Sequence, residues 1–235
     1  MNVGELTRDE FENAVKNNPV GIFVIGAVEA HGPHLPLNAD TIQPEWIAKE
    51  LGRRMENILI FPSINYGLHS STKNMPGTVS LTFDTMRALL YDVLVSAHEK
   101  GIDKFLIMTG HAGSGHMTAC SEACKRFVRE TDCKVMFLTD YDIAADSPDM
   151  KGIEGDGHGG MLETSRVLAI RPDLVKNIRP IGLYSDQGFM IRSSAEVCFP
   201  DGFAGDTSKA SEEIGKRINA FVVDKLEEMI KNGLV

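Results

Sequence analysis

Runs of apolar residues alternate along the chain with segments whose apolar residues recur at helical spacing. The first run, Val20 to Gly26, is continuous and rich in β-branched residues, and it predicts a buried strand. Shorter runs of the same kind predict further strands at 58–61, 105–108 and 134–138. Helices are predicted around these strands at 9–16, 41–55, 84–100 and 114–130. This alternation indicates an α/β fold with a mostly parallel sheet and helices on both faces.

Polar residues at the ends of these segments predict where helices begin. Thr7, followed three residues later by Glu10, has the pattern of a capping box for the first helix. Pro44 stands near the first turn of the second helix, where proline is tolerated. Asp84 is expected to cap the third helix. The stretch 63–81 is long, polar and punctuated by glycine and proline, and a loop of this length in a compact domain is usually functional.

The pattern loosens in the last part of the chain. Residues 141–160 are acidic and glycine-rich, and 178–203 are expected to be mixed loop and short strand. Helices are predicted at 162–170 and, as a long amphipathic segment, at 206–231. No repeat, low-complexity segment or linker interrupts the sequence, so residues 1–235 are expected to form a single domain.

Composition and charge exclude several classes of protein. The 235 residues are 43% hydrophobic and 24% charged, as in ordinary globular proteins. Lys plus Arg is 24 and Asp plus Glu is 33, so the formal net charge is −9, and no basic run longer than a pair is present. A nucleic-acid partner is therefore not expected. The longest apolar run, 20–28, is well short of the roughly 18 residues that a membrane-spanning helix needs, so no membrane partner is expected either.

The N-terminus and the cysteines indicate where the protein is located. The first residues, MNVGELTRDEFE, have neither a basic segment nor an apolar segment of the kind found in signal peptides. The four cysteines form no C-x-x-C pair and are expected to be reduced thiols. A cytoplasmic location is therefore expected.

Three polar clusters contain the candidate chemistry of this chain. The first two follow the predicted strands 20–26 and 105–108, and ligands of parallel sheets bind beyond the carboxyl ends of the strands. The third lies in the glycine-rich stretch before helix 162–170. Their sequences are GAVEAHGPHLPLNAD at 26–40, TGHAGSGH at 109–116 and GDGHGGMLETS at 155–165.

The first cluster has the donor types of a transition-metal site. Glu29 and His31 are two residues apart, so in an extended chain both side chains leave the same face. A carboxylate and an imidazole together suit Zn, Mn or Fe better than Ca or Mg. Asp40 could close back on this pair and, having two oxygens, bridge two metals that activate a hydrolytic water. The alternative is that Asp40 only caps a helix and His31 only occupies a turn.

The other two clusters add further candidate residues. His111 is flanked by Gly110 and Gly113, which allow a sharp turn and a close approach to a ligand; the alternative is an incidental histidine in a helix-entry turn. His158 lies among glycines five residues before Glu163, and that glutamate could instead simply compensate a helix dipole. Four further histidines are expected to be structural or at the surface, although the first and last of them are near enough to the clusters to line a pocket: His34, His69, His98 and His116.

The sequence Glu29-Ala-His31-Gly-Pro-His34-Leu-Pro-Leu with Asp40 strongly resembles the creatininase (creatinine amidohydrolase) family. Three more segments resemble this family in the same order along the chain: MPGTVSL at 75–81, the Gly110-His111 turn, and HGGMLETS at 158–165. The resemblance spans roughly residues 26–165, which is most of the chain.

The resemblance implies a three-layer α/β sandwich that contains two divalent metal ions, usually zinc or manganese and sometimes iron. The positions that match family metal ligands are Glu29, His31, Asp40 and His111, with Asp40 bridging the two ions. Glu163 matches a further carboxylate at the centre, and His158 matches the histidine thought to move a proton during ring opening. Family members are commonly homo-oligomers, usually hexamers built from dimers.

The sequence departs from the creatinine-hydrolysing enzyme at two places. That enzyme has an acidic residue two positions after the metal-binding histidine, where this chain has Gly113. It also closes its pocket with tryptophans, whereas the single tryptophan here, Trp46, lies in the helix predicted at 41–55. Creatinine is therefore not the expected substrate, and the lost acid makes Glu163 the expected carboxylate for the second metal.

These considerations give a main hypothesis and two alternatives. The main hypothesis is a di-metal hydrolase that acts on a small cyclic amide or a formamide, with His158 and Glu163 as catalytic residues. One alternative is a hydrolase of a cyclic keto-sugar or polyol with the same centre. The other is a metal-binding subunit in which the altered turn 109–114 has abolished turnover.

Overall fold

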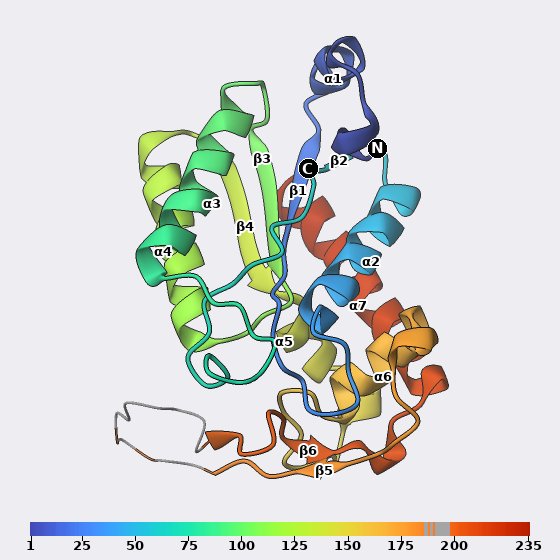
Figure 1. Ribbon diagram of the computed structural model, residues 1–235. Helices are drawn as coiled ribbons and strands as arrows, with labels where there is room; N and C mark the ends of the chain where they lie inside the picture. Colours follow the sequence, from blue (N-terminus) through green and yellow to red (C-terminus); the bar gives the residue numbers. More distant parts are fainter. Residues whose placement is uncertain (186–187, 189, 191–197) are drawn as a thin grey trace.

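A four-stranded parallel sheet forms the centre of the computed structural model, which describes residues 1–185, 188, 190 and 198–235 (Figure 1). The strand order is β2-β1-β3-β4. Their bounds are β1 Val20–Ile25, β2 Ile58–Ile60, β3 Lys104–Thr109 and β4 Lys134–Thr139. The register pairs Ile25 with Thr109 and Thr109 with Thr139, so three strands end level at one edge of the sheet.

Helices cover both faces of this sheet, which confirms the three-layer α/β fold. The principal helices are α1 Arg8–Val15, α2 Ala39–Arg54, α3 Phe83–His98, α4 Ser114–Glu130, α5 Asp140–Ala145, α6 Met161–Ile170 and α7 Glu212–Gly233. Figure 1 shows α3 and α4 on one side of the strands and α2 and α7 on the other. A short antiparallel pair, β5 Ile181–Gly182 and β6 Gly205–Asp206, lies beyond the carboxyl ends of the large sheet.

The apolar residues of β1 alternate between two separate cores because neighbouring side chains in a strand point to opposite faces. Phe23 and Ile25 pack with the residues of α3 and α4, such as Leu90. Val20, Ile22 and Val24 instead pack with the residues of α2 and α7. Both faces of the strand are therefore buried, which explains why its sequence is a continuous apolar run rather than an alternating one.

Two helix starts differ from expectation. The capping box of Thr7 and Glu10 is present at α1, as predicted. At α3, however, the cap is Thr82, whose side chain accepts a hydrogen bond from the backbone N–H of Thr85, and Asp84 lies within the first turn. Helix α2 begins at Ala39, two residues earlier than predicted, so Asp40 lies in its first turn and Asn38 is the N-cap residue.

The last part of the chain shows the largest differences between the predicted and the observed elements. The acidic stretch after β4 includes a helix, α5, whose N-cap Thr139 accepts a hydrogen bond from the N–H of Tyr141. Helix α7 begins at Glu212 rather than near 206, because Asp206 caps a short 3₁₀ turn and Ser211 then caps the helix. Part of the expected loop and strand at 178–203 lies outside the described residues. Among the described residues, no helix has both the length and the apolar character needed to cross a membrane.

Candidate metal centre

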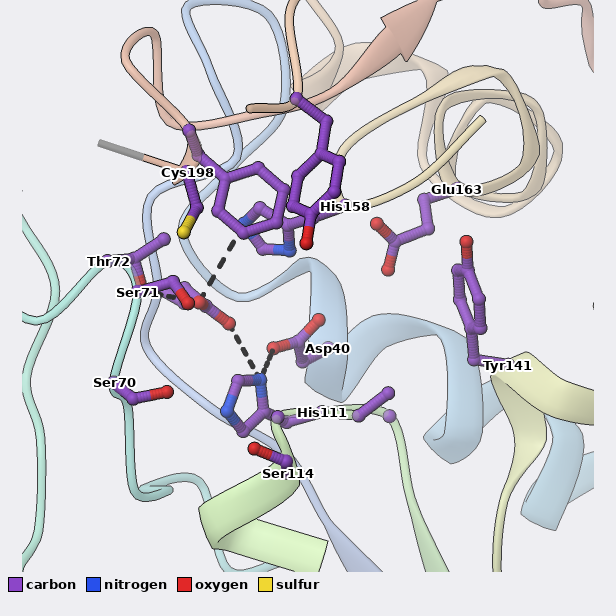
Figure 2. A pocket seen from close by; sticks show the side chains of 16 residues that line it. Asp40, Ser70, Ser71, Thr72, His111, Ser114, Tyr141, His158, Glu163 and Cys198 are labelled. Carbon is purple, nitrogen blue, oxygen red and sulfur yellow. Dashed lines mark hydrogen bonds and ion pairs between the residues drawn. The ribbon is translucent and has the colours of Figure 1, made fainter. Parts of the chain in front are cut away.

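The predicted polar clusters meet at the carboxyl edge of the large sheet. The segment after β1 carries Glu29 and His31, the turn after β3 carries His111, and the start of α6 carries Glu163. Figure 2 shows Asp40 beside the ring of His111, with Glu163 and His158 on other sides of the same cavity. The level ends of β1 and β3 bring the first two clusters together.

Two glycines allow the first turn of α2 to lie directly against the strand ends. A Cβ atom at Gly110 would overlap the backbone carbonyl of Asp40, and one at Gly26 would overlap the side chain of Thr41. Any larger residue at either position would push the helix away from the sheet. The close approach places the carboxylate of Asp40 between the strand-end loops that carry His31 and His111.

Asp40 presents one oxygen to each of two histidines. Its Oδ1 lies 3.0 Å from Nε2 of His31, and its Oδ2 lies 3.3 Å from Nδ1 of His111. The side chain of Asp40 is only 2% exposed and that of His31 is fully buried. The arrangement is the one that a carboxylate bridging two cations requires, since each oxygen faces a different nitrogen ligand.

Backbone carbonyls fix the orientation of both imidazole rings. Nδ1 of His31 donates to the carbonyl of Glu29 at 3.0 Å, so Nε2 faces Asp40. Nε2 of His111 donates to the carbonyl of Leu68 at 3.0 Å, so Nδ1 faces the carboxylates. Histidines that bind metals are commonly held in this way, by a hydrogen bond from the nitrogen that does not bind the ion.

Two glutamates complete the cluster. Glu29 Oε2 lies 2.7 Å from Nδ1 of His111, and Thr72 donates a hydrogen bond from its hydroxyl to Oε1. Glu163 Oε1 lies 3.9 Å from Nε2 of His31, and its Oε2 accepts a hydrogen bond of 2.5 Å from the backbone N–H of Gly159. Two overlapping groups therefore share Asp40: one contains His31 and Glu163, the other Glu29 and His111.

The start of α6 is built so that Glu163 faces inward. Asp156 caps this helix by accepting hydrogen bonds from the backbone N–H groups of Met161 and Leu162. Gly159 has a φ of 67°, which favours glycine, and its N–H holds Glu163. Further along the helix, the buried Arg166 donates 2.5 Å and 2.8 Å hydrogen bonds to Asp140 and Asn219. Arg166 thereby ties α6 to α5 and α7.

Burial and mutual attraction shift the pKa values of the cluster in opposite directions. Burial alone would raise the pKa of Glu29 and of Asp40, but the neighbouring histidines outweigh it and hold both values below their usual range. Burial alone would lower the pKa of His31, yet attraction to Asp40 raises it to about 10. The pKa of His111 is raised in the same way, mainly by Glu29. Without a metal, the histidines therefore carry protons that neutralise the carboxylates.

The donor atoms fit a pair of cations. Glu29 Oε2 and Asp40 Oδ2 are buried, and neither accepts a hydrogen bond of normal geometry from a described residue. Buried carboxylate oxygens that lack a well-formed hydrogen bond are costly unless a cation compensates them. Ligand atoms lie within 4.8 Å of one another in the group His31, Asp40 and Glu163 and also in the group Glu29, His69 and His111. Mixed imidazole and carboxylate ligands suit Zn, Mn or Fe.

A cavity of about 320 Å³ opens onto this cluster. His158 lies in its wall, where Nε2 donates to the carbonyl of Ala30 at 2.8 Å and stands 3.7 Å from Glu29 Oε1. The ring of His158 lies 4.2 Å from that of His31 and 5.7 Å from that of Phe199. Other lining residues carry hydroxyl groups: Ser70, Ser71, Thr72, Ser114, Tyr141 and Tyr184.

Several contributors were not found by sequence reasoning. Thr72 and the aromatic lining residues Tyr184 and Phe199 carry no motif of their own. His69, expected to be structural or at the surface, lies 3.7 Å from Glu29. The long polar loop at 63–81 was the available signal for Thr72 and His69.

The remaining histidines stay outside the cavity lining. His34 and His116 are buried, and neither is among the residues that line the cavity. His34 is hydrogen-bonded to Thr164, and His116 contacts Thr109 and the backbone N–H of Leu68. His98 lies at the end of α3, far along the sheet from the cluster.

Residues 4–230 match the model of the creatininase family, described as creatinine amidohydrolase. The match covers nearly the whole chain, including all three polar clusters.

Curated relatives have several different activities. A creatinine amidohydrolase of Pseudomonas putida is 31% identical over 74% of this chain and 73% of its own length. A mycofactocin precursor peptide peptidase of Mycobacterium ulcerans is 27% identical over 94% of this chain and 88% of its own length. A 3-dehydro-scyllo-inosose hydrolase of Thermotoga maritima is 23% identical over 97% and 81% of the two chains.

Solved structures include creatininases with metals. A creatininase described as the manganese form has a TM-score of 0.91 and 26% identity, and the match covers 99% of this chain and 98% of that one. A zinc–zinc form of a glutamate-to-glutamine mutant creatininase has a TM-score of 0.90 at the same identity and coverage.

Proposed function

This chain belongs to the creatininase family of amidohydrolases, and from that premise we propose that it is a di-metal hydrolase of a small cyclic amide or formamide. The observation that carries the proposal is the pair of buried carboxylate oxygens, Glu29 Oε2 and Asp40 Oδ2, which lie on either side of His111 Nδ1 and accept no hydrogen bond of normal geometry from a described residue. A buried cluster with this deficit is stable when cations take the place of the protons.

The proposed ligand sets share Asp40. Glu29, Asp40 and His111 would hold one ion, and His31, Asp40 and Glu163 would hold the other. Zinc or manganese suits these donors best, with iron as a further candidate. When bound, the ions supply Lewis acidity and lower the pKa of water.

The protein groups would hold the substrate and move its protons. His158, in the cavity wall, is proposed to donate a proton to the leaving nitrogen. Glu163, which faces His31, is proposed to be the carboxylate ligand that fixes the second ion. The rings of Tyr184 and Phe199, tilted by 46° with centroids 5.4 Å apart, would exclude water from one side of a small planar substrate.

The hydroxyl-rich lining favours a second candidate function. Several serine and threonine hydroxyl groups, those of Ser70, Ser71 and Ser114 among them, face a cavity of about 320 Å³. Such a surface can hydrogen-bond a polyhydroxylated ring, and one relative is named as the hydrolase of a keto-inositol. A cyclic keto-sugar is therefore the alternative substrate class, acted on at the same centre.

A substrate screen with metal-loaded protein tests the proposal. The panel contains cyclic amides, N-formyl compounds, cyclic keto-sugars and short peptides, each with the His158→Ala variant as a background control. Turnover of an amide or formamide that disappears in the variant supports the proposal. Turnover of the keto-sugars alone contradicts the amide proposal and supports the second candidate function. Binding without turnover across the panel contradicts both and favours a catalytically silent metal-binding subunit.

A further inference from the structure

One more histidine lies at the metal centre without a role in the proposed ligand sets. His69 is in the loop between β2 and α3, is only 2% exposed, and is not among the residues that line the cavity. Neither ring nitrogen of His69 has a hydrogen-bond partner among the described residues.

The ring of His69 faces the ligands of one ion. Its Nε2 lies 3.7 Å from Glu29 Oε2, and the ring centroids of His69 and His111 are 4.6 Å apart. The distance of 3.7 Å is too long for a hydrogen bond. Two atoms that each lie about 2.0–2.1 Å from one zinc are separated by roughly 3–4 Å, which is the spacing seen here.

The surrounding loop holds His69 in this position. The backbone N–H of His69 donates to Ser80 Oγ at 2.9 Å, and the preceding N–H of Leu68 donates to Nδ1 of His116. The carbonyl of Leu68 in turn accepts from His111, so the two histidines are fixed to each other through one residue. A metal ligand needs such support, because a displacement of about 1 Å at the donor atom is enough to lose the bond.

We infer that His69 is an additional ligand, through Nε2, of the ion held by Glu29, Asp40 and His111. This inference rests on the proposed metal centre and adds a residue to it. It explains why a buried histidine is left without hydrogen-bond partners, a state that is costly when no ion is bound. It also gives this ion a fourth protein ligand, since Nε2 of His69 faces Glu29 Oε2.

The test replaces His69 and measures metal binding rather than activity. His69→Asn keeps a polar side chain but removes the imidazole. We expect one of the two ions to bind at least about tenfold more weakly to this variant in a zinc titration. In His69→Cys the thiolate would be a new ligand, and cobalt(II) loading should produce a thiolate-to-cobalt charge-transfer band in the near ultraviolet. Wild-type protein loaded with cobalt(II) corrects for Cys198, which lines the cavity.

A matched control is provided by His34. It is buried like His69 but is bonded to Thr164, and it belongs to none of the ligand groups. His34→Asn should keep both ions at wild-type affinity, which separates loss of a ligand from loss of a buried histidine. Thermal unfolding of all variants identifies any that fail to fold.

The possible results distinguish failure of the His69 inference from failure of the proposed metal centre. Two ions of unchanged affinity in His69→Asn, with no charge-transfer band in His69→Cys, overturn the role of His69 and leave the proposed centre intact. A lower melting temperature with unchanged metal binding also overturns it, because His69 would then serve packing alone. Absence of bound metal in the wild-type protein contradicts the proposed function itself.

Discussion

Clusters of histidine and acidic residues lie at both ends of the sheet, and they differ in burial. At the amino ends of the strands, His98 Nδ1 lies 2.9 Å from Asp103 Oδ1 and 3.2 Å from Cys133 Sγ. The side chain of Asp103 is 62% exposed and that of His98 is 37% exposed. Water can solvate these groups, so the cluster needs no ion.

The cluster at the carboxyl ends has the same kinds of donor atoms at similar spacing. There, however, the side chains of Asp40 and Glu163 are 2% and 4% exposed. Glu29 Oε2 and Asp40 Oδ2 accept no hydrogen bond of normal geometry from a described residue. Proximity of ligand atoms is common to both clusters. Burial with unmet hydrogen bonds is what distinguishes a metal centre from a solvated surface group.

The largest effect is expected from removal of the shared carboxylate. Asp40→Ala should lose both ions together, because each proposed site takes one oxygen from this residue. Activity should fall by at least about a thousandfold, since the chemistry depends on the ions. Metal content per chain, measured by mass spectrometry after gel filtration, checks this. A variant that retains two ions would show that Asp40 does not bridge them.

The next largest effect separates catalysis from metal binding within the buried cluster. His158→Ala should keep both ions yet reduce kcat by about 10²–10⁴-fold, the usual range for loss of a general acid. The measurement is metal content together with kcat on the substrate found by the screen. Undiminished turnover would remove the proton-transfer role from His158.

A pH series should reveal opposite trends in the metal-free and metal-loaded protein. The pKa of His31 rises from 6.5 to about 10 without metal, so its charged form stabilises the fold fully below pH 6.5, and this contribution is lost as the pH rises through 10. Metal must displace that proton, so metal affinity should instead increase by about tenfold per pH unit over this window.

Two measurements check the pH series. Urea unfolding of the metal-free protein should show stability falling toward pH 10, and competitive zinc titrations should show tighter binding. His31→Gln should weaken the first trend, and the part that remains is due to His111, whose pKa is also raised. Zinc affinity that stays flat between pH 6.5 and 9 would mean that no proton is displaced from the site.

The smallest effect is expected at the exposed cluster. Asp103→Ala should change the free energy of unfolding by no more than about 0.5 kcal/mol and leave metal content unchanged, because both partners of its hydrogen bond are reached by water. Loss of an ion in this variant would place a third metal in the protein and erase the contrast between the two clusters.

The sheet could be predicted from sequence because each strand is a compact apolar run between turn residues. Helix starts were less predictable, since several residues near each start can cap it. Thr82 and Asp84 are both good caps, and the structure uses the first. Likewise Asp206 and Ser211 compete, and the helix begins after the second.

The residues of the candidate site also fall into those that could be predicted from sequence and those that could not. Residues beside strand ends, such as Glu29 and His111, could be proposed because parallel strands bring their carboxyl ends together. His69 could not, because the loop 63–81 has no periodicity and its path depends on tertiary contacts. Those contacts are the hydrogen bonds from His69 to Ser80 and from Leu68 to His116.

The most direct test of the central claim is the metal content of the wild-type protein beside His111→Ala, both purified without chelator and without nickel affinity resin. The account predicts close to two zinc, manganese or iron ions per wild-type chain and a clear reduction in the variant, because Nδ1 of His111 faces both Glu29 and Asp40. No metal, or one weakly held ion that the variant leaves unchanged, would contradict the account.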